Sequence, residues 1–114
     1  MDLTIGEVDY YDFKTKTWNT VRSPLPRQRA GTWTIASGSK LVIMNGESAM
    51  QVPAHNEVEV LDTEIGTWSK LPNLNQGRNG TGMVYYKGET CVTAGSANRG
   101  GGPEINSTEA LDWK

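Results

Sequence analysis

The chain alternates short runs of apolar residues with segments that contain glycine or proline. Residues 57–61, with the sequence Glu-Val-Glu-Val-Leu, alternate charged and apolar side chains with the period of two that marks a half-buried strand. Residues 32–36, 40–44 and 67–71 form further short runs of strand type. Gly or Pro interrupts every window in which a helical period begins. The pattern therefore predicts an all-β fold built from short antiparallel strands.

These runs recur at a spacing of forty-nine or fifty residues, so that residues 58–95 repeat residues 8–46 almost step for step. The matching positions are 8–12 and 58–62, Trp18 and Trp68, 29–31 and 78–80, and 45–46 and 94–95. A third copy begins with residues 106–112, which match residues 56–62. Repeats of this length made of short strands are typical of β-propellers, in which four-stranded blades stack around a central axis.

Each repeat is expected to supply four antiparallel strands, named here inner, second, third and outer. Residues 8–21 would give the end of one blade, with a third and an outer strand. Residues 31–71 would give one complete blade, and residues 80–112 three strands of a further blade. The chain, taken as a single domain of residues 1–114, would then hold nine strands, a little over two blades.

The recurring residues resemble the Kelch repeat, whose pattern contains Tyr-Asp, Trp, Leu-Pro, Arg, Ala-Gly, a hydrophobic strand and Gly-Gly. The matching residues are Tyr11, Asp12, Trp18, Pro26, Arg29, Ala30, Gly31 and 41–43 in the first copy, and Asp62, Trp68, Leu71, Pro72, Arg78, Gly80 and Gly95 in the second. Asn45 and Ala94 replace the first glycine of the doublet. The resemblance, which is greatest to Kelch proteins of bacteria, implies Kelch-type propeller blades of four antiparallel strands, about two blades per chain.

Two recurring residue types have a structural explanation in this reading. Trp18 and Trp68 are large planar groups that are suited to filling the space between blades. Asp12 and Asp62 are expected to close the turn between the third and outer strands by hydrogen bonds from their side chains to the backbone.

About two blades cannot close a ring, because propellers have four to eight. An isolated pair would expose strand edges and two apolar faces. We therefore expect either a homo-oligomer that completes a propeller ring or missing blades supplied by a longer parent chain. Three chains would give six blades if the extra third strand of each chain were displaced or paired elsewhere.

Charge and hydropathy exclude some partners. The chain has 11 Lys+Arg against 13 Asp+Glu with no basic cluster, so neither a nucleic acid nor a membrane surface is an expected partner. No run approaches the roughly 20 apolar residues of a membrane span. Residues 1–5 lack the basic and apolar regions of a signal peptide. The compartment stays unknown, and a periplasmic or extracellular location would fit a chain truncated at its N-terminus.

The ligands of propellers usually meet the loops at one end of the central channel. Arg29, Arg78, Asn79 and Arg99 are the candidate ligand-binding residues in such loops. The recurring guanidinium groups of Arg29 and Arg78 would suit bidentate binding of a carboxylate or an acidic sugar. The alternative, which we favour, is structural: each arginine would donate to loop carbonyls of the neighbouring blade.

Glu47 and His55 lie in the long loop between a second and a third strand, and they are the candidate catalytic residues as an acid/base pair. We favour the alternative of a solvated glutamate and a histidine bonded to loop backbone. One histidine and no cluster of ligands predict no metal site and no cofactor. The single cysteine, Cys91, is read as a small buried apolar residue and not as a nucleophile.

The leading interpretation of function is a binding module of the Kelch propeller type that presents its loops to a protein or glycan partner. The first alternative is a carbohydrate-active propeller enzyme such as a sialic-acid mutarotase or epimerase, because such Kelch enzymes use acidic and basic residues of the channel. The second alternative is a fragment without independent activity. An enzyme would require Glu47, His55, Arg29 and Arg78 to converge in one concave pocket.

Overall fold

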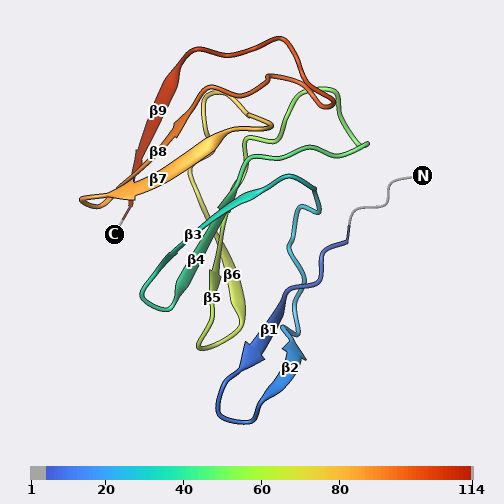
Figure 1. Cartoon of the computed structure of the whole chain (residues 1–114), viewed down its shortest axis with the longest axis vertical. Helices are drawn as coiled ribbons and strands as arrows, with labels where there is room; N and C mark the ends of the chain where they lie inside the picture. Colours follow the sequence, from blue (N-terminus) through green and yellow to red (C-terminus); the bar gives the residue numbers. More distant parts are fainter. Residues whose placement is uncertain (1–4, 114) are drawn as a thin grey trace.

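The computed structural model describes residues 5–113, which form nine β-strands in three antiparallel sheets (Figure 1). The strands are β1 (Asp9–Asp12), β2 (Thr17–Thr20), β3 (Trp33–Ser37), β4 (Lys40–Met44), β5 (Val58–Asp62), β6 (Thr67–Leu71), β7 (Gly82–Tyr86), β8 (Glu89–Thr93) and β9 (Thr108–Asp112). This part of the chain contains no helix with the length and hydropathy needed to cross a bilayer. Residues 1–4 and Lys114 lie outside the described residues. The expectation that residues 1–5 are not a signal peptide therefore falls almost entirely on residues that the structure does not describe.

The prediction of an all-β fold of antiparallel strands is confirmed. Strands β1 and β2 form the first sheet, β3-β4-β5-β6 form the second sheet in that order, and β7-β8-β9 form the third. The strands of the second sheet lie within one residue of the four predicted runs, and those of the first and third sheets lie inside residues 8–21 and 80–112. The three sheets follow one another in chain order, from the first sheet at the bottom of Figure 1, through the second, to the third at the top.

The turns that follow β1 and β5 are closed by an aspartate, as predicted. Asp12 Oδ1 accepts the backbone N–H of Lys14 at 2.8 Å, and Asp62 Oδ1 accepts that of Glu64 at 3.0 Å. The Lys40 ammonium donates to Asp62 Oδ2 at 3.0 Å. The hydrogen bond from Lys40, followed by that from the Glu64 N–H, lowers the pKa of Asp62. Both turns are therefore fixed by side-chain hydrogen bonds to the chain that follows.

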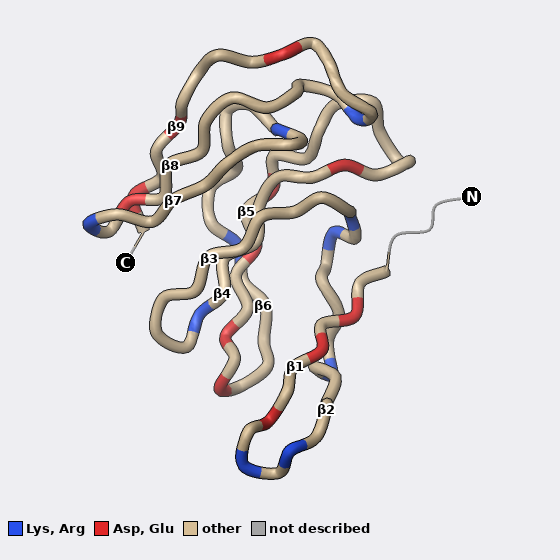
Figure 2. The backbone as a smooth tube through the Cα atoms, viewed as in Figure 1, with Lys and Arg blue, Asp and Glu red and all other residues tan. Residues whose placement is uncertain are grey.

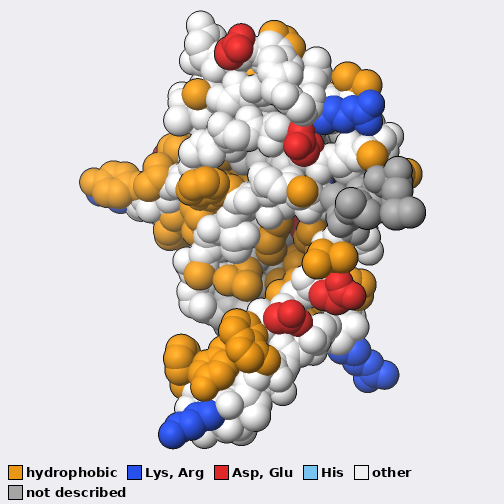
Figure 3. All heavy atoms as spheres, turned by 45° about the vertical axis from the view of Figure 1, so that its right-hand side comes forward, with side chains coloured by type: hydrophobic (Ala, Val, Ile, Leu, Met, Phe, Trp, Pro, Cys, Tyr) orange, Lys and Arg blue, Asp and Glu red, His pale blue; other side chains and the backbone are white. Residues whose placement is uncertain are grey.

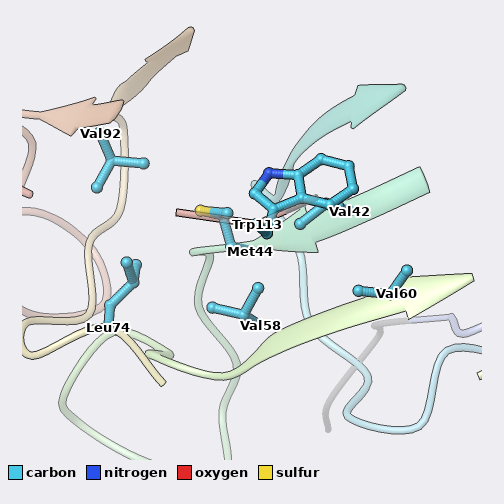
Figure 4. Close-up of a cluster of buried hydrophobic side chains, with 7 residues drawn as sticks. All are labelled: Val42, Met44, Val58, Val60, Leu74, Val92 and Trp113. Carbon is cyan, nitrogen blue, oxygen red and sulfur yellow. The ribbon is translucent and has the colours of Figure 1, made fainter. Parts of the chain in front are cut away.

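The main hydrophobic core lies between the second and third sheets (Figure 4). Its buried side chains are Val42, Met44, Val58, Val60, Leu74, Val92 and Trp113. The Trp113 ring lies 5.4 Å from the Tyr85 ring, and the Trp113 indole N–H donates to Thr90 Oγ1 at 2.6 Å. Since Trp113 follows β9 directly, this contact anchors the end of the third sheet in the core.

The opposite face of the second sheet turns toward the first sheet. Leu41 and Leu61 of that face line a cavity of about 450 Å³ together with Val8 and Tyr10 of the first-sheet segment. The first sheet is therefore packed less tightly on the second sheet than the third sheet is.

The two recurring tryptophans have different surroundings. The Trp68 indole N–H donates to the Ser23 carbonyl at 2.9 Å, which ties the second sheet to the segment that leaves the first. Trp18 holds the same position in the first sheet but is 71% exposed, because its face of that sheet is uncovered. The predicted contact between repeats is thus made by Trp68 and not by Trp18.

Charged residues of both signs are distributed over the chain (Figure 2). Two ion pairs between a buried arginine and a glutamate recur inside the fold: Arg29 with Glu59, and Arg78 with Glu109. Each arginine precedes the first strand of its sheet, and each glutamate belongs to the third strand. The two pairs therefore hold the entering segment against the same strand position in the second and third sheets.

Candidate functional site

The Arg29 side chain is fully buried. Its Nε donates to the Asn45 carbonyl at 2.8 Å, and its Nη1 donates to the Arg27 carbonyl at 2.7 Å and to Glu59 Oε2 at 2.7 Å. A guanidinium group in these surroundings is held by the protein itself. The favoured structural interpretation expected bonds to loop carbonyls of the neighbouring blade. The carbonyls that Arg29 contacts belong instead to its own sheet and entering segment.

Arg78 occupies the equivalent position of the third sheet, and its side chain is also fully buried. Its Nη1 donates to the carbonyls of Ala94 and Ser107 at 3.0 and 2.7 Å, and its Nη2 lies 3.4 Å from Glu109 Oε2. The recurrence of Arg29 and Arg78 therefore places two cations within the sheets, where each neutralises a glutamate and satisfies carbonyls.

Three other candidate residues lie together where the second and third sheets meet. Asn79 Nδ2 donates to Glu47 Oε2 at 2.7 Å, and the Gly100 N–H donates to the same oxygen. Arg99 Nη1 donates to the Ala49 carbonyl at 3.0 Å. Glu47 is thus not the solvated glutamate of the sequence-based interpretation: it joins the two sheets.

Backbone hydrogen bonds join the two long loops in the same place. The Ala54 N–H donates to the Ala97 carbonyl at 2.8 Å, and the Arg99 N–H donates to the Val52 carbonyl at 2.8 Å. We call the joined loops, residues 47–55 and 96–105, the loop ledge; they meet at the upper right of Figure 1. Successive repeats therefore present one continuous loop surface.

The outer surface of the loop ledge combines apolar and cationic groups. Met50 is 79% exposed and Val52 is 56% exposed. The Arg99 residue is also exposed, although its side chain is fixed on the Ala49 carbonyl. Large exposed apolar groups beside a positioned arginine are the kind of surface that protein partners use.

His55 is buried and is held by two side chains, neither of which is Glu47. Ser48 Oγ lies 2.8 Å from His55 Nε2, and Glu57 Oε2 lies 3.0 Å from His55 Nδ1. The predicted pair of Glu47 and His55 is not formed, because Glu47 is bonded to Asn79 and Gly100 instead. Nor does the histidine ring bond to loop backbone as the alternative proposed.

The charge on Glu57 is favoured by its surroundings. Burial raises the pKa of Glu57, but the Glu57 backbone N–H, the hydrogen bond from His55 and the charges of His55 and Arg29 together outweigh it. The pKa of Glu57 is therefore lowered. Arg27 Nε adds a further contact, 3.4 Å from Glu57 Oε1.

The order serine, histidine and carboxylate is the one that activates a serine nucleophile in hydrolases. Here Ser48 is only 5% exposed, and its Oγ also accepts the Met50 N–H at 3.3 Å. A nucleophile needs open space above its oxygen for the substrate carbonyl. The arrangement is therefore suited to holding the loop of residues 47–55 in place.

Three cavities lie away from the loop ledge. Those of about 450, 340 and 390 Å³ are lined mainly by residues from the first sheet, its flanking segments and the facing side of the second sheet. Arg29 borders the second of these, whereas Glu47, His55 and Arg78 border none of the three. Within residues 5–113, no three His, Cys, Asp or Glu side chains form a group that would hold a metal ion.

Sequence reasoning missed the acidic partners of this region. Glu57 lies two residues from His55 in an extended segment, a spacing that puts both side chains on one side of the chain. Glu59 and Glu109 recur fifty residues apart, as their arginines recur at forty-nine, which was the signal for the buried pairs. Neither a protein-family model nor a curated protein sequence matches the chain.

Proposed function

We propose that the chain is a Kelch-type β-propeller module that binds a protein or glycan partner through the loop ledge. The propeller assignment is supported by three sheets that repeat one strand order at the spacing of the sequence repeat. It is also supported by the recurrence of a buried arginine–glutamate pair in the second and third sheets. Stacked sheets of this kind place the loops of successive repeats side by side.

The observation that carries the binding function is the backbone joining of the two loops. Four groups take part in two hydrogen bonds, Ala54 to Ala97 and Arg99 to Val52. A surface that is already ordered loses less conformational entropy when a partner binds, and so retains more of the contact energy as affinity. Met50 and Val52 on this surface favour a protein over a glycan as the partner, because both side chains are apolar and exposed.

The carbohydrate-active alternative depended on the convergence of Glu47, His55, Arg29 and Arg78 in one pocket. Arg29 and Arg78 are buried in separate sheets, and His55 is enclosed by Ser48 and Glu57. The geometry therefore supports a binding module better than a channel enzyme.

Two defined probes test the proposal: a phage-displayed library of random peptides and a printed glycan array. Both are applied to the immobilised chain and to its Met50→Ser and Arg99→Glu variants. We expect peptide ligands whose affinity falls roughly tenfold or more in each variant, the change that corresponds to about 1.4 kcal/mol. Ile65→Ser is the matched control, since Ile65 is 71% exposed but lies in the turn after β5, away from the ledge.

Each outcome has a defined meaning. Glycan ligands that respond to the two ledge variants would keep the ledge as the site and change the class of partner. Ligands that bind all variants equally well, or the absence of any peptide or glycan ligand, would show that the loop ledge is not a binding surface.

A further inference from the structure

The three sheets stack in one consistent sense. Cross-strand neighbours Ile35, Val42 and Val60 share one face of the second sheet, and this face packs on the third sheet in the core. Leu41 and Leu61 share the opposite face, which turns toward the first sheet. The second sheet therefore has one face that meets the next sheet of the chain and one face that meets the previous sheet.

Two of these faces are uncovered within the described residues. The first is the Val84 face of the third sheet, made of Val84, Tyr86, Cys91 and Ala110, in which Val84 is 57% exposed and Tyr86 is 65% exposed. Cys91, which was predicted to be buried, is only half-buried because nothing covers this face within the described residues. It corresponds by position to the face of the second sheet that carries Val42, which is fully buried. The Val84 face is thus of the type that meets a next sheet.

The second uncovered surface is the Trp18 face of the first sheet, made of Tyr11, Phe13 and Trp18. The ring centroid of Tyr11 lies 5.3 Å from that of Phe13 and 5.5 Å from that of Trp18. Trp18 is 71% exposed and Phe13 is 85% exposed. Tyr11 corresponds to Leu61, which is 1% exposed, so the Trp18 face is of the type that meets a previous sheet.

The two uncovered faces are therefore opposite halves of the interface that the chain already forms twice within itself. The space-filling view shows hydrophobic side chains gathered on the β1–β2 hairpin at the bottom (Figure 3). A second group lies on the projection at the left, which is the β7–β8 hairpin of the third sheet. Exposed aromatic groups in such numbers mark a surface that another protein covers.

We infer that two copies of this chain associate head to tail, with the Val84 face of each copy packed on the Trp18 face of the other. The number of copies rests on the proposed propeller, whose rings close with four to eight sheets. Each copy brings three sheets, of two, four and three strands. One copy would give three stacked sheets and three copies would give nine, so two copies, with six sheets, are the number that falls within this range. Such a head-to-tail contact closes when the second copy returns to the first.

Strand exchange between copies is opposed by the way in which β9 is held. β9 pairs with β8 over five residues, and Glu109 of β9 accepts the N–H groups of Asn75 and Gln76 at 2.7 and 2.9 Å. Trp113 then anchors the end of β9 in the core. Displacing β9, one way in which a three-chain ring could lose its extra third strand, would break all of these contacts. Adding whole sheets breaks none of them.

Light scattering coupled to size exclusion tests the inference on the full 114-residue chain. One copy has a mass of 12.5 kDa, and we expect twice that, about 25 kDa, at tens of micromolar. Val84→Lys and Trp18→Glu should each reduce the mass to that of one copy, since each spoils one half of both contacts. Ile65→Glu, at an exposed position outside the two faces, should leave the larger mass unchanged.

Mixing the two variants separates head-to-tail association from other dimers. A pair made of one Val84→Lys copy and one Trp18→Glu copy has one intact contact and one contact between lysine and glutamate. The mixture should therefore recover the mass of two copies. In a dimer formed by two like faces, only one of the variants would have an effect.

The inference is wrong if the unmodified chain has the mass of one or three copies, or if the mixture stays monomeric while both variants keep the far-ultraviolet circular dichroism of the parent. Tyr86→Lys replaces Val84→Lys should that variant fail to fold. Ligand binding at the loop ledge is measured separately with ledge variants, so failure of one proposal leaves the other distinguishable.

Discussion

Arg29 Nη1 donates to Glu59 Oε2 at 2.7 Å, and the two side chains are 0% and 2% exposed. The other carboxylate oxygen of Glu59 accepts the Arg27 N–H at 3.1 Å. One buried glutamate thus fixes the backbone and a side chain of the segment that enters the second sheet. Its counterpart in the third sheet, Glu109, does the same for the segment that contains Arg78.

Removal of one member of this pair should cost far more than removal of both. Arg29→Met leaves Glu59 buried without its cation, and we expect a loss of about 3–5 kcal/mol in the free energy of unfolding. The double variant Arg29→Met/Glu59→Leu should lose less, because no buried charge is left. Urea unfolding followed by tryptophan fluorescence measures both.

Arg27→Met serves as the control for this pair, because its side chain is 59% exposed and a surface ion pair contributes about 0–1 kcal/mol. Equal losses in the single and double variants would contradict the argument from an uncompensated charge.

Gly77, in the segment before β7, lies directly against the loop of residues 47–55. A Cβ atom there would lie 2.7 Å from the Ala54 carbonyl carbon and closer still to its oxygen. Gly77→Ala should therefore lower the free energy of unfolding by about 1–3 kcal/mol, as overpacking does. Gly82→Ala is the control, because a Cβ atom at Gly82 would have no neighbouring atom within 4 Å. Similar unfolding curves for the two variants would show that the backbone yields at Gly77.

Ala94 sits where the sequence pattern calls for glycine, and its φ is +58°. A left-handed conformation costs a residue with a Cβ about 1–2 kcal/mol, and glycine avoids this cost. Ala94→Gly should therefore raise the thermal midpoint by a few degrees, as a gain of about 1 kcal/mol does for a domain of this size. Ala36→Gly, in the regular part of β3, should lower it. Calorimetry of the two variants checks the opposite signs.

The lowered pKa of Glu57 predicts a dependence of stability on acid. Since the folded value lies below the ordinary value of 4.5, Glu57 stabilises the fold above that pH, and the contribution is lost as the pH falls through the folded pKa. In His55→Gln, the charge and the hydrogen bond of His55 are altered, so the pKa of Glu57 should rise. Carboxyl chemical shifts followed by NMR from pH 2 to 7 measure it directly.

Glu64→Gln is the control for this titration, because Glu64 is exposed in the turn after β5. If the Glu57 titration in His55→Gln coincides with that of the parent chain, His55 does not contribute to the charge on Glu57.

The sequence located the strands well, because the period-two alternation of residues 57–61 reports burial on one face of a sheet. The partner of Glu47 could not be predicted from the sequence, because the bond to Asn79 spans thirty-two positions and depends on how two sheets stack. The partners of His55 were misjudged because the chain doubles back within the loop, where the His55 N–H donates to the Gly46 carbonyl at 2.8 Å. Local alternation sets a strand, whereas packing between repeats sets the site.

The hydrogen bonds that join the loop ledge run between backbone atoms, and this separates the chemistry of the surface from its shape. Point substitutions at Met50 or Val52 change what the ledge attracts without touching the bonds that hold it. An insertion of a single residue in either loop would shift the pairing of both. A new binding specificity can therefore be obtained by changing side chains freely, whether by natural or laboratory selection. A change in the length of one loop, however, requires a matching change in the other.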